Sequence, residues 1–261
     1  MYGAVCHDRA VALAQPEPLK MLVGTVVARG CANLGVTVRL SADQARRAAE
    51  LLPAGVALGP RPALLIETST CEAVTIDGVP IGPASLSEAA LSIRAPARVT
   101  GTRLRERYVE HLFMLSQLDS NPELSAFKAA AGYRTEVVPI SLERHGRALR
   151  RRHRARASAG GRLAPASASA GLTPPLLPPG VAVPNPGIVF KLWTRDEAGR
   201  LVVTTNVNSG ISRPALGRGQ VAVAADTPLA RLLGGVRATG VAFSGAAEQF
   251  VNDTYVVGAA G

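Results

Sequence analysis

The feature that most constrains the fold is a long succession of short apolar runs separated by turn signals, with only two segments of helical character. Runs such as 21–28, 34–40 and 187–193 are rich in Val, Leu and Ile, which is typical of strands. Asp77-Gly78 between two apolar runs predicts a tight hairpin, because both residues tolerate a positive φ. Strands do not alternate with helices, and no glycine-rich phosphate loop occurs. The sequence therefore predicts an α+β, predominantly β fold: a closed or strongly curved antiparallel β-barrel with a few short helices.

The two helical segments carry their own start and stop signals. Ser41 is a good N-cap and Gln44 lies three residues later, as a capping box requires. Apolar residues follow at helical spacing until Pro53 ends the helix. The second helix is predicted over 123–131, with Gly132 at the position where a left-handed residue commonly closes a helix.

The net charge of +10 is concentrated in one segment. Eight arginines lie between residues 144 and 162, and without them the net charge is about +2. The segment continues into a stretch rich in Ala, Ser, Gly and Pro up to Pro186. We interpret 144–186 as a solvated loop excursion from a single domain that spans 1–261. The alternative is a patch that binds an acidic partner, but we do not expect nucleic acid, because no aromatic residues are interleaved with the arginines.

Cys6, Cys31 and Cys71 have neither metal-site spacing nor a nearby histidine cluster. We expect inert thiols in a reducing cytoplasm and no metal site. No signal peptide is evident, and no stretch of about 18 apolar residues occurs, so we expect neither export nor a membrane span. The abundance of Ala and of Arg over Lys indicates a bacterial, GC-rich genome.

Polar residues embedded in apolar segments are the candidates for chemistry: Glu67, Glu88, His111, Lys128, Glu136 and Lys191. A carboxyl group enclosed by a β-barrel would have a raised pKa, which suits it to acid–base catalysis. The alternative is that alternation along each strand turns these residues to water, and that Lys128 is exposed on its helix. Only three of the 29 basic residues are lysines, namely Lys20, Lys128 and Lys191, and only these can form an imine with a carbonyl compound.

Several short motifs, in their order along 34–257, resemble the acetoacetate decarboxylase superfamily. They are the segments 51–58, 85–88, 118–122, 190–193 and 228–232, followed by the last strand. The resemblance implies a β-rich, cone-shaped barrel around an apolar pocket, in a homo-oligomer. It also implies an imine-forming lysine, a second lysine that lowers its pKa, and an assisting glutamate, which falls on Glu88.

The family's lysine pair is missing at the matching positions. A gap-free alignment from Asp119 places the pair on Thr135-Glu136, and an alignment shifted along the helix places it on Ala129-Ala130, beside Lys128. Without an adjacent cation, an amine lacks one of the influences that keep it neutral at pH 7.

We therefore predict a cofactor-independent enzyme of secondary metabolism for a carbonyl-bearing metabolite, for example a polyketide-like one. It would act by cyclisation, dehydration or isomerisation without an imine, as a lyase or isomerase. The first alternative is a decarboxylase or aldolase that uses a relocated lysine, Lys128. The second is a non-catalytic binding protein whose arginine run holds an acidic partner. The candidate catalytic residues are Glu88, Glu136, Thr135 and Lys128, and the candidate substrate-binding residues are His111, Met114 and Lys191.

Overall fold

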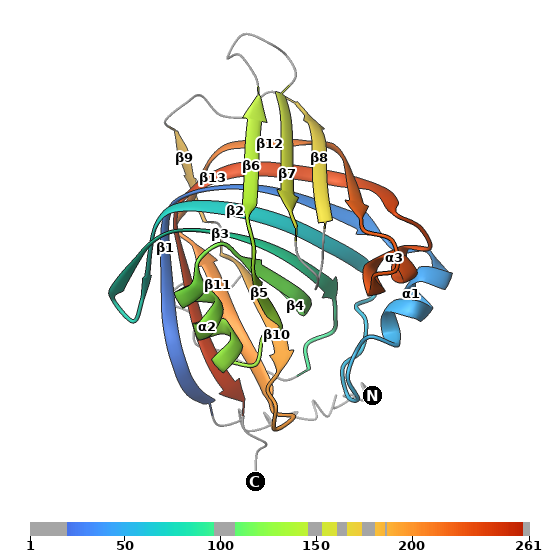
Figure 1. Cartoon of the computed structure of the whole chain (residues 1–261), viewed down its shortest axis with the longest axis horizontal. Helices are drawn as coiled ribbons and strands as arrows, with labels where there is room; N and C mark the ends of the chain where they lie inside the picture. The colour runs from blue at the N-terminus through green and yellow to red at the C-terminus, as the bar shows by residue number, and fades with distance from the viewer. Residues whose placement is uncertain are drawn as a thin grey trace, which may run out of the picture.

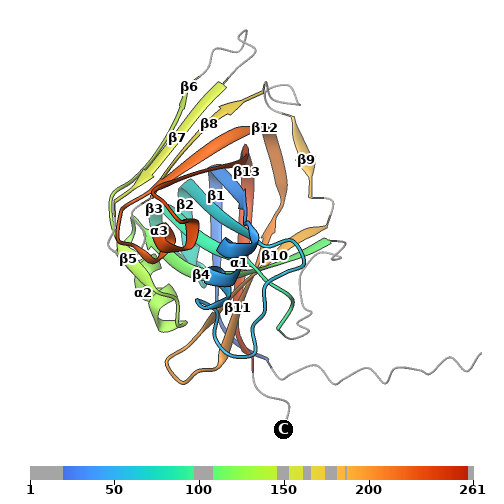
Figure 2. The same cartoon turned by 90° about the vertical axis from the view of Figure 1, so that its right-hand side faces the viewer.

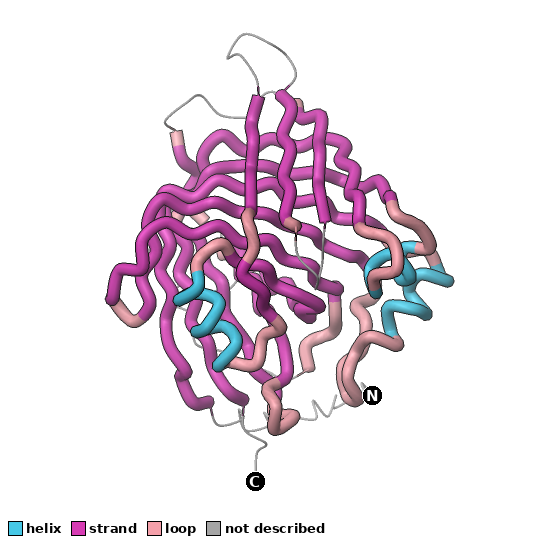
Figure 3. The backbone as a smooth tube through the Cα atoms, viewed as in Figure 1, coloured by secondary structure: helices cyan, strands magenta, loops and turns pink. Residues whose placement is uncertain are grey.

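The computed structural model describes residues 20–96, 108–145, 153–160, 166–173, 181–185 and 187–257. The helices are α1 (Ala42–Ala49), α2 (Pro122–Ala130) and α3 (Pro228–Leu233). The strands are β1 (Lys20–Arg39), β2 (Ala63–Ile76), β3 (Val79–Ser92), β4 (Tyr108–Asp119), β5 (Thr135–Val137), β6 (Ile140–His145), β7 (His153–Ala159), β8 (Ala166–Leu172), β9 (Ala182–Pro184), β10 (Ile188–Arg195), β11 (Leu201–Asn208), β12 (Gly210–Val223) and β13 (Arg237–Val257). The prediction of a mostly β structure with few helices is confirmed, as Figure 3 shows.

Seven strands close into a ring in the order β1-β2-β3-β4-β10-β11-β13, because β13 pairs with β1. The sheet is strongly curved, and its long strands arch across the molecule in Figure 1. The predicted antiparallel arrangement holds for most pairs, but β4 runs parallel both to β10 and to β5. β4 therefore pairs with β10 along its first half and with β5 at its end.

The sheet continues past the ring along the first half of β13, through β12, β8, β7 and β6. This part curls back, so that β6 contacts β2 and β3, and Figure 2 shows β6, β7 and β8 side by side. Between the two layers lies the largest apolar cluster, in which Leu34, Val36 and Leu64 pack with small residues such as Ala157 and Ala168. A core with so few aromatic residues packs closely because alanines let the layers approach each other.

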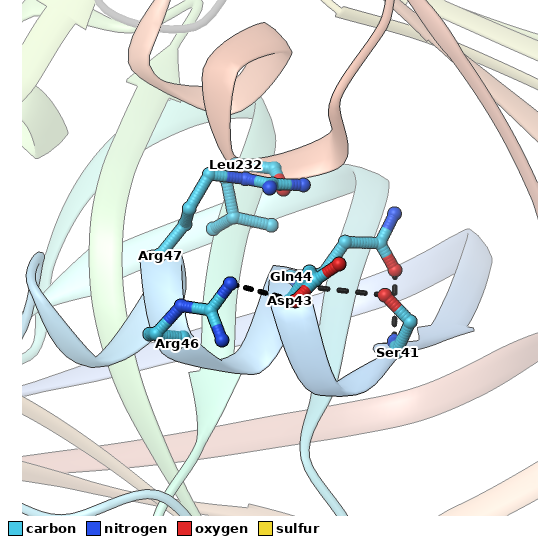
Figure 4. A network of polar contacts seen from close by, with 6 residues as sticks. All are labelled: Ser41, Asp43, Gln44, Arg46, Arg47 and Leu232. Carbon is cyan, nitrogen blue, oxygen red and sulfur yellow. Dashed lines mark hydrogen bonds and ion pairs between the residues drawn. The ribbon is translucent and has the colours of Figure 1, made fainter.

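The local signals of the helices are confirmed. Ser41 caps α1 and forms the capping box with Gln44, and Gln44 Nε2 also donates to the carbonyl oxygen of Leu233 at 2.7 Å. Arg47 Nε donates to the carbonyl oxygen of Leu232 at 3.1 Å, so α1 is fastened to the end of α3 (Figure 4). The predicted hairpin is also present, with positive φ at both turn residues, Asp77 and Gly78.

Three expectations are corrected. The segment 144–186 is not a loop throughout, because β7, β8 and β9 lie within it as strands of the main sheet. The two strands predicted over 21–28 and 34–40 are one strand, β1, in which Gly30 takes a positive φ of 61°. Cys31 and Cys71 are not free thiols but form a disulfide between β1 and β2, while Cys6 lies outside the described residues. None of the helices in the described ranges is long and apolar enough to cross a membrane.

Candidate functional site

One row of polar side chains crosses four neighbouring strands inside the ring. Glu67 on β2 is directly opposite Glu88 on β3, Glu88 is opposite Gln117 on β4, and Gln117 is opposite Thr135 on β5. Residues that face each other in a sheet project from the same side. The two carboxyl groups therefore lie on adjacent strands of one face, with an amide and a hydroxyl beyond them.

Glu67 is fixed by neighbours that donate hydrogen bonds to its carboxyl group. Asn33 Nδ2 donates to Glu67 Oε1 at 3.0 Å, and Ser69 Oγ donates to the same oxygen at 3.4 Å. Asn33 is itself held, because its Oδ1 accepts a hydrogen bond from the Gly245 backbone at 2.8 Å. Burial nevertheless raises the pKa of Glu67, and the two hydrogen bonds oppose this only in part.

Helix α2 brings Lys128 to the same cluster. The helix begins at Pro122 after the N-cap Asn121, whose side chain accepts from the Leu124 backbone at 3.0 Å. Lys128 is only 4% exposed, and its Nζ lies 4.9 Å from the centre of the Tyr133 ring. No hydrogen bond or ion pair joins Lys128 Nζ to another residue in the described part of the chain.

Tyr133 fixes the aromatic face against which this amine lies. Its hydroxyl is 2.6 Å from Thr204 Oγ1 and donates to the carbonyl oxygen of Leu192 at 3.0 Å. Thr204 Oγ1 is in turn 2.9 Å from Thr254 Oγ1. Because the ring is anchored at its far end to β10 and β11, the cation–π contact does not depend on a freely rotating side chain.

The carboxyl groups near Lys128 have displaced pKa values. Burial raises the pKa of Glu88 to about 8; Lys128 opposes the rise, and the charges of Glu67 and Asp119 add to it. Burial also raises the pKa of Asp119 to about 6, against a hydrogen bond from Gln117 Nε2 at 3.0 Å and the charge of Lys128. The pKa of Lys128 is lowered by burial, although Glu88 and Asp119 both favour its charged form. At pH 7 Glu88 is therefore mostly protonated and able to donate a proton.

The predicted site residues fall into two groups. Glu88, Thr135 and Lys128 belong to the cluster just described, although Thr135 Oγ1 donates to the Ser125 carbonyl oxygen. Met114 is opposite Ala90, two residues along β3 from Glu88, and packs with Tyr133.

The remaining three lie on the other face. Glu136 is opposite Leu118, which belongs to the main apolar core. Lys191 and His111 face each other on β10 and β4, one residue away from the pair Leu192–Leu112 that faces the ring. His111 Nδ1 accepts from Trp193 Nε1 at 3.0 Å, so its direction is fixed away from Glu88.

The sequence prediction did not single out three members of the cluster, Gln117, Asp119 and Tyr133, and it named Glu67 as a candidate for chemistry without a specific role. A signal for Glu67 was present. Counting pairs back from the Asp77-Gly78 turn places residue 67 opposite residue 88, and this is the pairing in the structure. Tyr133 gave no such signal, because its position depends on how α2 returns to the sheet.

Solved structures supply the comparison with known proteins. An acetoacetate decarboxylase-like enzyme from Sphingomonas wittichii RW1 matches with a TM-score of 0.58 and 13% identity, over 89% of this chain and 91% of that one. Acetoacetate decarboxylase from Legionella pneumophila matches with a TM-score of 0.55 and 12% identity, over 98% and 97%. The enduracididine biosynthesis enzyme MppR, in a complex with pyruvate, matches with a TM-score of 0.53 and 15% identity, over 95% and 91%.

The chain has the acetoacetate decarboxylase-like fold. No protein-family model matches the sequence, and no curated protein matches it, which agrees with the low identities. The fold-level resemblance inferred from short motifs is thereby confirmed. The gap-free alignment from Asp119 predicts the lysine pair on Thr135-Glu136, and of these two residues Thr135 stands in the same row as Glu88.

Proposed function

We propose that the chain is an enzyme for a carbonyl-bearing small molecule, in which Lys128 is the reacting amine and Glu88 transfers protons. The observation that carries this proposal is the environment of Lys128. Its amine is buried, it has no ion-pair partner among the described residues, and its pKa is lowered. Removal from water favours the neutral amine, which is the nucleophilic form.

The steps follow from these protonation states. The neutral amine of Lys128 attacks the carbonyl carbon, and one proton of the attacking nitrogen is transferred to the carbonyl oxygen, which becomes a hydroxyl group. Glu88, with a pKa of about 8, supplies the proton that lets the hydroxyl group leave as water, so that an imine forms. The cationic imine forms at Lys128 Nζ, which lies over the Tyr133 ring, and the face of the ring stabilises this charge.

The protonated imine withdraws electrons from the neighbouring carbon. A bond to a carboxylate, to another carbon or to hydrogen at that carbon can then break and leave its electron pair in an enamine. Keto acids are the substrate class that we favour, because they offer a carbonyl group that can form the imine and, in a 3-keto acid, a carboxylate on the neighbouring carbon that can leave as CO₂. A structural neighbour that contains pyruvate supports the choice of a small keto acid as the first probe.

A second candidate is acid–base catalysis without an imine, as the sequence analysis predicted. The observation that favours it is Thr135, which occupies the place of the expected lysine in the row with Gln117 and Glu88. In that case Glu88 moves protons on the substrate directly, and Lys128 only contributes charge.

Borohydride trapping distinguishes the two candidates. The protein is incubated with pyruvate and sodium borohydride, and the modified peptide is identified by mass spectrometry. We expect an adduct on Lys128 and none on Lys191, whose presence in the same sample is the internal control. Lys128→Met should remove the adduct.

If no lysine is modified by pyruvate or by acetoacetate, the imine proposal is rejected. Loss of turnover in Glu88→Gln, with a substrate that Lys128→Met still converts, would then support catalysis without an imine. Unchanged turnover in Glu88→Gln would reject both candidates.

A further inference from the structure

A groove with a volume of about 840 Å³ lies on the sheet formed by β6, β7, β8, β12 and β13. It is remote from the Lys128 cluster in the pairing order, since β1 and β13 stand between β2 and β12. Figure 2 shows these outer strands together on one side of the molecule. The volume is within the range of sites for small organic ligands.

The floor of the groove is one row of directly opposed residues. The row runs through Glu143, Arg156, Ser169, Gln220 and Thr239, on β6, β7, β8, β12 and β13 in turn. All five side chains therefore project from one face. Each of them can donate a hydrogen bond except Glu143, which is at one end of the row.

Two arginines stand on either side of β8 and converge on this floor. Arg156 is opposite Ser169, and Arg218 is opposite Gly171, two residues further along β8 on the same face. Two strand spacings separate β7 from β12, about 10 Å, a gap that two extended arginine side chains can bridge from both sides. Neither guanidinium group has a hydrogen-bond or ion-pair partner in the described part of the chain.

The middle of the groove is left open by a residue without a side chain. A Cβ atom on Gly171 would meet nothing within 4 Å, so packing does not require glycine there. The φ of Gly171 is not positive, so the backbone does not require glycine either. The open space beside Ser169, between two unpaired guanidinium groups, has the size and charge of a site for a small anion.

We propose that this groove is a second ligand site, which binds a phosphorylated small molecule through Arg156 and Arg218. Each guanidinium group offers a planar pair of donors that matches two oxygens of a phosphate. The Ser169 hydroxyl and the Gln220 amide supply further donors from the floor. Glu143 is directly opposite Arg156 at one end of the row, so the phosphate is expected on the other side of Arg156, toward Arg218 and Gln220.

Isothermal titration of the full chain with inorganic pyrophosphate in 150 mM NaCl tests the proposal. We expect one site per chain, and binding at least tenfold weaker in Arg156→Gln and in Arg218→Gln. Gly171→Leu should also abolish binding, because its side chain fills the open space next to Arg218, which is directly opposite, while both guanidinium groups are retained. Thermal melting should show that all three variants remain folded, since the substituted residues are exposed.

Arg46→Gln is the matched control, because it removes an exposed arginine on α1 that pairs with the equally exposed Asp43. Equal weakening by Arg46→Gln would mean that binding follows the net charge, which would overturn the site. Citrate that binds as tightly as pyrophosphate would overturn the assignment to phosphate. Absence of any binding by the wild type would overturn the whole inference. None of these outcomes depends on the chemistry of Lys128, so this proposal and the proposed function fail independently.

Discussion

Replacing Glu88 with glutamine should make the protein more resistant to alkaline pH. The pKa of Glu88 is about 8 in the folded chain, against an ordinary value of 4.5. Because the folded-state pKa lies above the unfolded-state value, the stability that the protonated Glu88 contributes is fully present below pH 4.5. It is lost progressively as the pH rises through 8. The full displacement corresponds to at most about 5 kcal/mol of lost stability above pH 8, and glutamine, which does not ionise, avoids this loss.

Urea unfolding of the wild type and of Glu88→Gln at pH 5, 7 and 9 measures the effect. The difference in the free energy of unfolding, variant minus wild type, should increase by several kcal/mol between pH 5 and pH 9. Glu248→Gln is the control for the Glu-to-Gln substitution itself, because Glu248 is exposed on β13. A constant difference between wild type and Glu88→Gln from pH 5 to pH 9 would show that Glu88 is already charged at pH 5. It could not then be the proton donor at neutral pH.

Three further predictions concern other parts of the molecule. Gly240→Ala should lower the free energy of unfolding by about 2 kcal/mol or more, because its Cβ would collide with a backbone carbonyl oxygen of β1. Gly171→Ala should leave this free energy unchanged or raise it by about 0.5 kcal/mol. Urea unfolding of the two variants compares them. Lys128→Met removes the amine whose charged form lowers the pKa of Glu88 and Asp119, so the stability that these carboxyl groups contribute should persist to higher pH in the same series. The Cys31–Cys71 disulfide joins residues 40 apart, so Cys31→Ser with Cys71→Ser should cost about 4 kcal/mol, and the oxidised, denatured wild type should show one free thiol with a thiol reagent.

Local signals predicted the local structure well. The capping box at Ser41 and the turn at Asp77-Gly78 depend only on residues within a few positions of each other, and both occur as predicted. Such interactions can be predicted from the sequence because no distant part of the chain has to be positioned first.

The arrangement across the sheet could not be predicted in the same way. Whether Lys191 or Lys128 approaches Glu88 depends on the pairing of β10 with β4 and on the return of α2 to β5, both of which are long-range. A shift of one residue in β10 would have turned Lys191 to the other face. The alanine- and serine-rich strands β7 and β8 were missed because small residues have weak strand propensity and are stabilised here by packing between layers.

The pairing of β1 with β13 has a consequence for how the chain is made. Residues in these strands are more than 200 positions apart, yet they are paired from Lys20–Val257 to Thr37–Val241. A chain that leaves the ribosome from its N-terminus must therefore hold one edge of β1 unpaired until β13 has been synthesised. Such distant contacts make folding slow, so we expect nascent chains that stop before β13 to depend on chaperones. The same adjacency of residues 20 and 257 makes a short linker between them, with new ends opened in an exposed turn such as Asp77-Gly78, a practical circular permutation.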